Sequence, residues 1–266
     1  MRYGYVTDLG FLDGDEKSTM IFNSLVECGY DYIELPLTTI ALFDKEKYDL
    51  FKKTLADNNL PCRANYLIFP HDMILNGPQF DINVIKKHLE MVLPVAADIG
   101  SEVVIFGNGM PRSVKEGDTP ESVFAQMQQI VETIDPIATK NGVKVVVEPF
   151  CKEVTNNINS YQESVDLVRS VNAKNVGGLC DWWHVNKDDL PMDDVRNNPN
   201  ELFHLHIAYT KDRLIPSLDD ISEYADFAGA VKSIGYDNKI SIEAFPPDVC
   251  KEKIKEGLAT MKKLFE

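Results

Sequence analysis

The chain has 266 residues, of which 44% are apolar, 26% charged and 9% aromatic, a composition typical of a folded protein with a large apolar core. It carries 42 acidic and 27 basic residues; a net charge of −15 without a basic run argues against a nucleic-acid partner. No segment approaches the roughly 18 consecutive apolar residues of a membrane helix, so we expect no membrane partner.

The cysteines and the N-terminal segment both bear on cellular location. The five cysteines are odd in number, widely scattered and without a CxxC pair, which predicts reduced thiols. The first residues turn acidic at once and do not resemble a secretory signal. We therefore predict a cytoplasmic protein.

Short apolar runs typical of β-strands alternate with longer segments along the whole chain. Several runs, such as VKVVVE and EVVIF, are almost continuously apolar, as expected for a parallel sheet covered on both faces. We predict eight strands, at residues 3–6, 32–35, 63–68, 102–106, 143–148, 176–180, 202–207 and 239–243.

The segments between these strands have the period of amphipathic helices. Within residues 82–99, for example, apolar side chains recur at spacings of three and four, and residues 254–265 repeat the pattern. Thr119 followed by Pro120 predicts a helix start, as does the Ser160 to Glu163 capping box. Glycine stands where several helices should end before the next strand.

Eight strand–helix units of roughly 33 residues predict a (β/α)8 TIM barrel. No linker or shift in composition divides the chain, so we expect residues 1–266 to form a single domain. The alternative is an open, doubly wound sheet, which would normally use fewer strands and carry a glycine-rich phosphate loop. The GNG segment at 107–109 does not match such a loop, and we interpret it as a plain βα turn.

Four consecutive predicted strands, the fifth to the eighth, deliver potential metal ligands to one rim of the barrel. Active sites of such barrels lie at the C-terminal ends of the strands. Three carboxylates crowded there would repel one another without a cation, although solvated rim charges are the alternative. The oxygen-rich set favours Mn²⁺, with Mg²⁺, Co²⁺ or Zn²⁺ possible. The four residues are Glu148, Asp181, His206 and Glu243.

Three further residues accompany this set. His204 and His206 point to the same side of their strand, and the later one lies nearer the mouth; we therefore take His206 as the ligand and His204 as an interior, hydrogen-bonded residue. His184 and Arg213 follow strands six and seven, where an imidazole and a guanidinium can contact a substrate. Each of these two, taken alone, is better explained as an ordinary surface or loop residue.

The C-terminal half also contains several longer motifs that are similar to those of a known family. They are VVVEPF, NNINS, VGGLCDWWHV, HLHIAYTKDR and YDNKISIEAF. These motifs resemble the xylose isomerase-like TIM barrels, especially the sugar phosphate isomerase/epimerase group that contains the ketose 3-epimerases. The resemblance covers essentially the whole chain. It implies that the four strand-end residues bind the metal, that Glu148 and Glu243 are also the catalytic acid/base pair, and that His184 and Arg213 contact the sugar.

The resemblance implies proton abstraction from a ketose or related sugar through a metal-stabilised cis-enediolate. Two glutamates acting on opposite faces would give epimerisation, and one acting alone would give aldose–ketose isomerisation; the sequence leaves both open. Many ketose 3-epimerases carry a second glutamate six residues after the strand-five ligand. That position is Val154 here, and we expect its neighbour Glu153 to substitute as a substrate contact.

Other functions on the same scaffold remain alternatives. A metal-dependent lyase, resembling inosose dehydratase or the C-glycoside-cleaving enzymes, would share the ligand set and expel a leaving group instead. An apurinic endonuclease would need many more histidines than the five present, and a non-catalytic sugar-binding protein would not need the intact quartet. Barrels of this group often form homo-dimers or homo-tetramers, and we expect a free sugar or polyol as the small-molecule partner.

Residues of the first half contribute less to the prediction. Some polar residues near strand ends are interpreted mainly as loop or rim structure: Glu34, Asn65, Tyr66, Asn108 and Arg112. Some aromatic residues near strand ends are consistent either with an apolar wall around the site or with loop packing: Phe11, Phe69, Trp182, Trp183 and Phe245.

Overall fold

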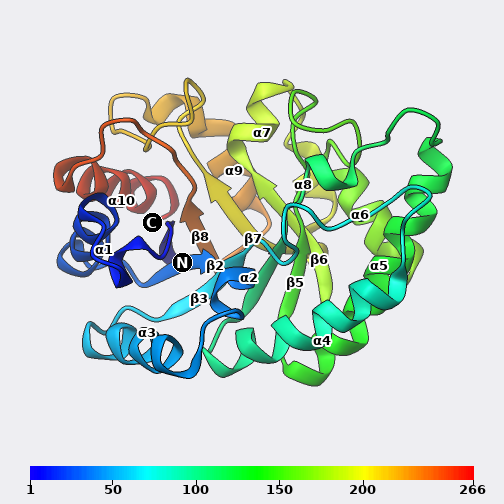
Figure 1. The fold of residues 1–266 in the computed structure, drawn as a ribbon. Coiled ribbons are helices and arrows are strands. Elements are labelled where there is room, and N and C mark those ends of the chain that lie inside the picture. The colour runs from blue at the N-terminus through cyan, green and yellow to red at the C-terminus, as the bar shows by residue number, and fades with distance from the viewer.

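The computed structural model describes residues 1–266 as a closed barrel of eight parallel strands surrounded by helices (Figure 1). Each strand pairs with the next, and β8 pairs with β1. The predicted (β/α)8 barrel is therefore confirmed, and the open sheet is wrong. The strands are β1 (Arg2–Val6), β2 (Tyr32–Pro36), β3 (Cys62–Tyr66), β4 (Val103–Phe106), β5 (Lys144–Val147), β6 (Val176–Asp181), β7 (Leu202–Ile207) and β8 (Lys239–Ile242).

Helices cover the outside of the barrel, and α1 and α10, from opposite ends of the chain, pack side by side (Figure 1). None of the helices combines the length and the apolar character needed to cross a membrane. The α-helices are α1 (Glu16–Cys28), α2 (Leu37–Ile40), α3 (Lys45–Asp57), α4 (Ile82–Asp98), α5 (Pro120–Asn141), α6 (Tyr161–Ser170), α7 (Trp182–Lys187), α8 (Asp193–Asn197), α9 (Ala225–Ser233) and α10 (Lys251–Phe265). The four 3-10 helices are η1 (Gly10–Leu12), η2 (Met110–Arg112), η3 (Pro199–Glu201) and η4 (Ile221–Tyr224).

The helix boundaries follow the local signals in the sequence. The Thr119 side chain accepts a hydrogen bond from the amide of Ser122 and caps α5, and Ser160 caps α6 in the same way. Strand ends differ slightly from the prediction. β3 stops at Tyr66 because Leu67 adopts a positive φ of 58°, which an extended strand does not allow. The last residues predicted for strands five and eight lie just beyond β5 and β8.

The apolar core has two parts between barrel and helices and a third inside the barrel. The inner part is a small cluster of apolar side chains in which Tyr32 is fully buried. Gly4 makes room for the Tyr32 ring, since a Cβ at this position would lie 2.2 Å from it. The barrel interior is thus filled with side chains below its mouth, as is usual for this fold. The other members of the inner cluster are Ala64, Val103, Ile105, Val146 and Leu179.

The N-terminal end of the barrel holds a group of charged residues, which we call the basal ion cluster: Arg2, Arg63, Glu102 and Lys239. The Glu102 carboxylate accepts two hydrogen bonds of 2.7 Å from Arg2 and one of 2.9 Å from Lys239. Arg63 approaches the same carboxylate to 3.8 Å. One carboxylate is therefore matched by three cations at this end.

Candidate active site

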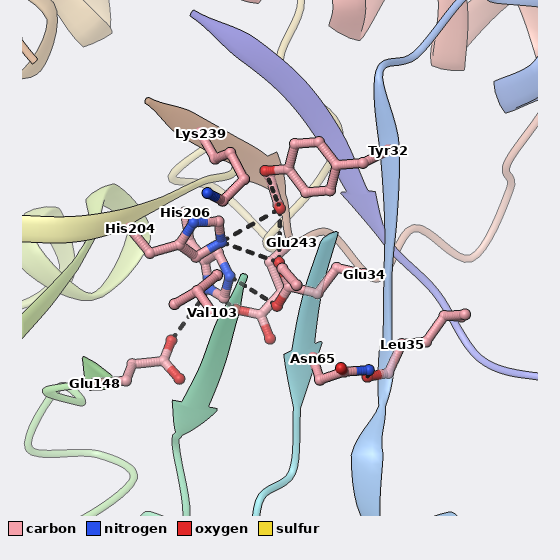
Figure 2. Close-up of polar contacts among 12 residues, drawn as sticks. Tyr32, Glu34, Leu35, Asn65, Val103, Glu148, His204, His206, Lys239 and Glu243 are labelled. Carbon is pink, nitrogen blue, oxygen red and sulfur yellow. Dashed lines mark hydrogen bonds and ion pairs between the residues drawn. The ribbon is translucent and has the colours of Figure 1, made fainter. Parts of the chain in front are cut away.

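The four predicted ligands meet at the C-terminal end of the barrel, and we call them the carboxylate–histidine quartet: Glu148, Asp181, His206 and Glu243. One ligand atom from each lies within 4.8 Å of all the others. His206 Nδ1 lies 3.3 Å from Glu148 Oε1 and 3.1 Å from Glu243 Oε2. The pairs around His206 are visible in Figure 2. The structure therefore brings together all four residues that the sequence singled out.

Strand ends and one glycine position the carboxylates of the quartet. The Glu148 amide donates to the Phe106 carbonyl at 3.2 Å, and the Glu243 amide donates to Ile207 at 3.1 Å, so both residues continue the ladders of their strands. A Cβ on Gly107 would lie only 2.3 Å from Glu148 Oε2. Gly107 therefore leaves space for the carboxylate. The interpretation of GNG as a plain turn missed this requirement, because an absent side chain gives no motif.

The electrostatics of the quartet separate its two glutamates. Burial and the neighbouring Glu243 carboxylate raise the pKa of Glu148. Burial also opposes charge on Glu243, but Arg213 and His206 outweigh it and lower the pKa of Glu243. Burial likewise opposes a charged His206 imidazole, yet Glu34 and Glu243 raise its pKa well above the ordinary value. One glutamate of the pair thus favours the proton and the other favours the ionised form.

Arg213 lies directly over the quartet. Its Nη2 donates to Asp181 Oδ2 at 2.9 Å and also to Glu243 Oε2. Its guanidinium carbon lies 4.8 Å from the Trp183 ring centroid and 5.1 Å from that of Phe245, so the two rings flank the cation. The residue predicted to contact substrate therefore contacts two members of the quartet. Of the predicted aromatic wall, Trp183 and Phe245 are the members that border this site.

His184, the other predicted substrate contact, is held as a hydrogen-bond donor. Its Nδ1 accepts from the Cys151 amide at 3.1 Å. Burial lowers the pKa of His184 to about 4, which keeps the imidazole neutral near pH 7 and places its proton on Nε2. Nε2 has no hydrogen-bond partner and lies 3.6 Å from Asp181 Oδ2. An unpaired donor is thus available beside the quartet.

Glu153 lies apart from the quartet. Its side chain is 68% exposed and its carboxylate pairs with Lys187 Nζ at 3.0 Å. The role of Glu153 as a substrate contact stays a prediction. Val154, at the position where the resemblance calls for a glutamate, packs toward Gly109, where a Cβ would lie 2.9 Å from its Cγ1.

Three of the polar residues from the first half bind backbone carbonyls. Asn65 donates to Leu35 at 2.9 Å, Asn108 to Phe69 at 2.8 Å, and Arg112 to Glu148 at 2.6 Å. These bonds agree with their interpretation as structural residues. Three of the aromatic residues likewise pack on other aromatic rings: Phe11 on Phe22, Phe69 on Phe106 and Trp182 on Phe227.

Glu34 was interpreted as a rim residue, and this is wrong: its side chain is fully buried inside the barrel. Its carboxylate lies 3.0 Å from His206 Nε2 and 3.1 Å from His204 Nε2 (Figure 2). The prediction that His204 is an interior, hydrogen-bonded residue agrees with this position. One signal for Glu34 is present in the sequence, namely a carboxylate inside an otherwise apolar strand.

A cavity of about 210 Å³ opens beside Glu243, between β1, α1 and the segment after β8. Tyr66 borders it, and burial together with the Asp8 and Glu243 carboxylates raises the pKa of the Tyr66 hydroxyl. No member of the quartet lines the cavity, but Ala244, the residue after Glu243, does. Its lining residues are Tyr5, Val6, Thr7, Asp8, Lys17, Ile21, Tyr66, Ala244, Phe245, Pro246 and Val249.

The fold and the quartet lead to a family. The model of the xylose isomerase-like TIM barrel family matches residues 22–264. The chain belongs to this family. The inosose isomerase of Bacillus licheniformis is 26% identical over 253 residues, covering 88% of this chain and 86% of the relative. The ketose 3-epimerase of Arthrobacter globiformis is 21% identical over 242 residues, covering 90% and 81%.

Solved structures agree with the family at the level of the fold. The D-psicose 3-epimerase of Clostridium cellulolyticum H10, solved with D-tagatose, has a TM-score of 0.82 and 17% identity, and the match covers 100% of both chains. The resemblance inferred from the motifs is thus confirmed for the family.

The quartet fits a divalent metal ion by its chemistry. Three carboxylates and one imidazole offer hard oxygen donors and one nitrogen, all within reach of a single ion. A bound cation would also offset the repulsion that raises the pKa of Glu148.

Proposed function

We propose that this protein is a divalent-metal-dependent isomerase or epimerase of a ketose or related sugar such as an inosose. The observation that carries the proposal is the convergence of two glutamates with Asp181 and His206 at the mouth of the barrel. The names of the relatives support the same reaction class, because they include an inosose isomerase and ketose 3-epimerases. They do not favour the lyase alternative.

The two glutamates have complementary roles in this proposal. The metal, when bound, would act as a Lewis acid that stabilises the oxygen charge of a cis-enediolate. One of Glu148 and Glu243 accepts the proton from the sugar carbon, and the other donates a proton to the same carbon. Because β5 and β8 are separated by two other strands, the two carboxylates approach from different directions, which favours epimerisation.

The remaining contacts orient the sugar. His184 presents its Nε2 proton toward the site, where a sugar oxygen can accept it. Arg213 holds Asp181 and Glu243, and the rings of Trp183 and Phe245 lie near its guanidinium. These positions support substrate-binding roles for both residues.

The cavity beside Glu243 favours a neutral polyhydroxyl end over a phosphate. Asp8 lines the cavity and accepts hydrogen bonds from Gly10 and Ser18. The N-terminus of α1 nearby is already capped by Asp15. The Asp8 carboxylate at this wall accepts sugar hydroxyls and repels phosphate, and Lys17, the cation of the same wall, already donates to the Pro246 carbonyl. We therefore propose a free sugar or polyol as the substrate and Mn²⁺ as the preferred metal.

The test is mass spectrometry of ketoses, aldoses and inososes incubated with enzyme and Mn²⁺ in D₂O. Deuterium on one carbon of an otherwise unchanged formula supports the proposal; the product then separates epimerase from aldose–ketose isomerase. Loss of water or of an aglycone would assign the lyase instead. Glu148→Gln and Glu243→Gln are the matched controls, since each removes one proton-transfer group and keeps the side-chain size. Repeating the assay with Mg²⁺, Co²⁺ or Zn²⁺ in place of Mn²⁺ ranks the metals by the activity that each supports.

We also infer that residues 1–266 form one domain and that the protein is a cytoplasmic homo-dimer or homo-tetramer. All five cysteines are free, which supports a reducing compartment. Limited proteolysis tests the single domain, and light scattering coupled to size-exclusion chromatography tests the oligomeric state.

A further inference from the structure

Glu34 and His206 form a contact that the proposed reaction does not use. Glu34 is on β2 and His206 on β7, 172 residues apart in the chain. Both side chains are fully buried in the barrel, and Glu34 meets the His206 ring at the nitrogen that does not face the other quartet members. An ionised carboxylate in such a place is costly unless its oxygens are satisfied, so its partners indicate what it does there.

The two nitrogens of His206 face different groups. Nδ1 faces the quartet, at 3.3 Å from Glu148 and 3.1 Å from Glu243. Nε2 faces away from it, at 3.0 Å from Glu34 Oε1 (Figure 2). A carboxylate can only accept, so Nε2 must donate its proton to Glu34. Nδ1 faces carboxylates of the quartet in the same way, so a cation that binds among them would take the place of the Nδ1 proton, while Nε2 keeps its proton toward Glu34.

Other buried groups hold the Glu34 carboxylate in turn. Ser241 Oγ donates to Glu34 Oε2 at 2.6 Å, and His204 Nε2 donates to the same oxygen at 3.1 Å. The Tyr32 hydroxyl lies 2.8 Å from Ser241 Oγ, whose proton is already used, so Tyr32 donates to Ser241. Oε2 is thus fixed by two donors, while Oε1 is directed at His206.

We propose that Glu34 is a positioning residue that selects the Nε2-protonated tautomer of His206 and aims Nδ1 at the metal. The inference rests on the proposed function, because it assumes that the quartet binds a divalent ion. Carboxylates that hold a metal-binding histidine in this way contribute about 10- to 100-fold to metal affinity. Glu34 thus acts on the metal without touching it.

The first test measures Mn²⁺ binding by isothermal titration calorimetry. Glu34→Gln keeps the size of the side chain but offers one acceptor in place of two; we expect Mn²⁺ affinity to fall about 10- to 100-fold. Glu102→Gln is the matched control, since it makes the same change at the other end of the barrel, away from His206, and should change affinity less than about threefold. In a His206→Gln background, Glu34→Gln should have little further effect. An equal loss with and without His206 would mean a structural role and overturn the inference.

The second test needs no variant and so does not depend on the folding of Glu34→Gln. The wild-type protein labelled with ¹⁵N-histidine and loaded with Zn²⁺ should show, by NMR, a His206 bound through Nδ1 and protonated at Nε2. Binding through Nε2 would overturn the inference. Unchanged affinity in Glu34→Gln would overturn it too and leave the proposed function standing. Failure of the wild type to bind any divalent ion would instead overturn the proposed function itself.

Discussion

The two ends of the barrel carry charge of opposite excess. At the N-terminal end, the basal ion cluster sets three cations against the single carboxylate of Glu102. At the C-terminal end, the three carboxylates of the quartet and Glu34 share one arginine and the His206 imidazole. Both groups sit on strand ends of the same sheet.

This difference in charge indicates that the N-terminal end of the barrel serves the stability of the fold and the C-terminal end serves its function. In the basal ion cluster the carboxylate is bonded by two cations, and Arg2 and Glu102 are partly exposed to water, so the cluster can contribute modestly to the stability of the fold without any ligand. The quartet carries an excess of negative charge, which costs free energy until a cation arrives. In barrels of this type the C-terminal end is where binding and catalysis take place. Changes at the two ends should therefore have opposite effects on activity and on stability.

The largest effect should come from the glutamates of the quartet. We expect Glu243→Gln or Glu148→Gln to lower kcat by roughly 10³-fold or more, because each removes a proton-transfer group and a charged donor. The melting temperature of the metal-free protein should change by only a few degrees, since neutralising a crowded carboxylate relieves repulsion. Steady-state assays and circular dichroism test both parts. Full activity in either variant would contradict the assignment of that glutamate.

Metal binding should give the next largest effect. Mn²⁺ at about 100 times its Kd should stabilise the fold by about 2.7 kcal/mol, or roughly 5–10 °C in Tm, because the ion binds only the folded quartet. EDTA should reverse the shift, and Asp181→Asn should reduce it. Differential scanning fluorimetry measures each. Glu102→Gln, at the N-terminal end of the barrel, is the control. If Mn²⁺ no longer raised the Tm of this variant, the proposed division between a stabilising end and a functional end would be wrong.

Filling the space beside Glu148 should have a smaller effect on activity. Gly107→Ala would place a methyl group 2.3 Å from the present position of Glu148 Oε2, so the carboxylate must move. We expect kcat to fall about 10- to 100-fold, as is usual when a reacting group is displaced by about 1 Å. Gly109→Ala is a useful comparison, because its Cβ would meet Phe150 and Val154 and not the quartet. Equal losses in both variants would point to general disturbance of the loop.

The smallest effect is expected in the basal ion cluster. Glu102→Gln should lower the free energy of unfolding by about 1 kcal/mol at pH 7 and leave kcat unchanged. The loss is modest because Glu102 is 38% exposed, although its partner Lys239 is only 3% exposed. Urea unfolding measures the free energy of unfolding, and the steady-state assay measures kcat.

The pH dependence of this effect has a defined sign. Hydrogen bonds from Arg2 outweigh burial and lower the pKa of Glu102 from 4.5 to about 2. A carboxyl group whose pKa is lowered on folding contributes stability above its unfolded pKa and loses it as the pH falls. The difference between wild type and Glu102→Gln should therefore be constant above about pH 5 and shrink between pH 4.5 and 2. A difference that grows toward low pH would contradict this assignment.

Much of the fold and part of the candidate site could be predicted from the sequence. Period and composition gave the eight strands, because each strand is a local run of residues. The quartet followed from topology: the C-terminal ends of parallel strands share one rim, so Glu148, Asp181, His206 and Glu243 had to meet once the barrel was assumed. Gly107 could not be found in this way, since its role depends on the space that Glu148 fills.

The chain by itself therefore determined the order of strands and helices, the caps of α5 and α6, and the candidate ligand residues at the strand ends. All of these depend on neighbours in sequence or on one rule of topology. Only the tertiary structure decided the pairing of Glu34 with His206, the placement of Arg213 between two rings, and the exposure of Glu153. These contacts join residues on strands or loops far apart in the chain. They depend on how the closed barrel turns each side chain toward its interior, its mouth or the solvent, and local periodicity does not encode that direction across the barrel.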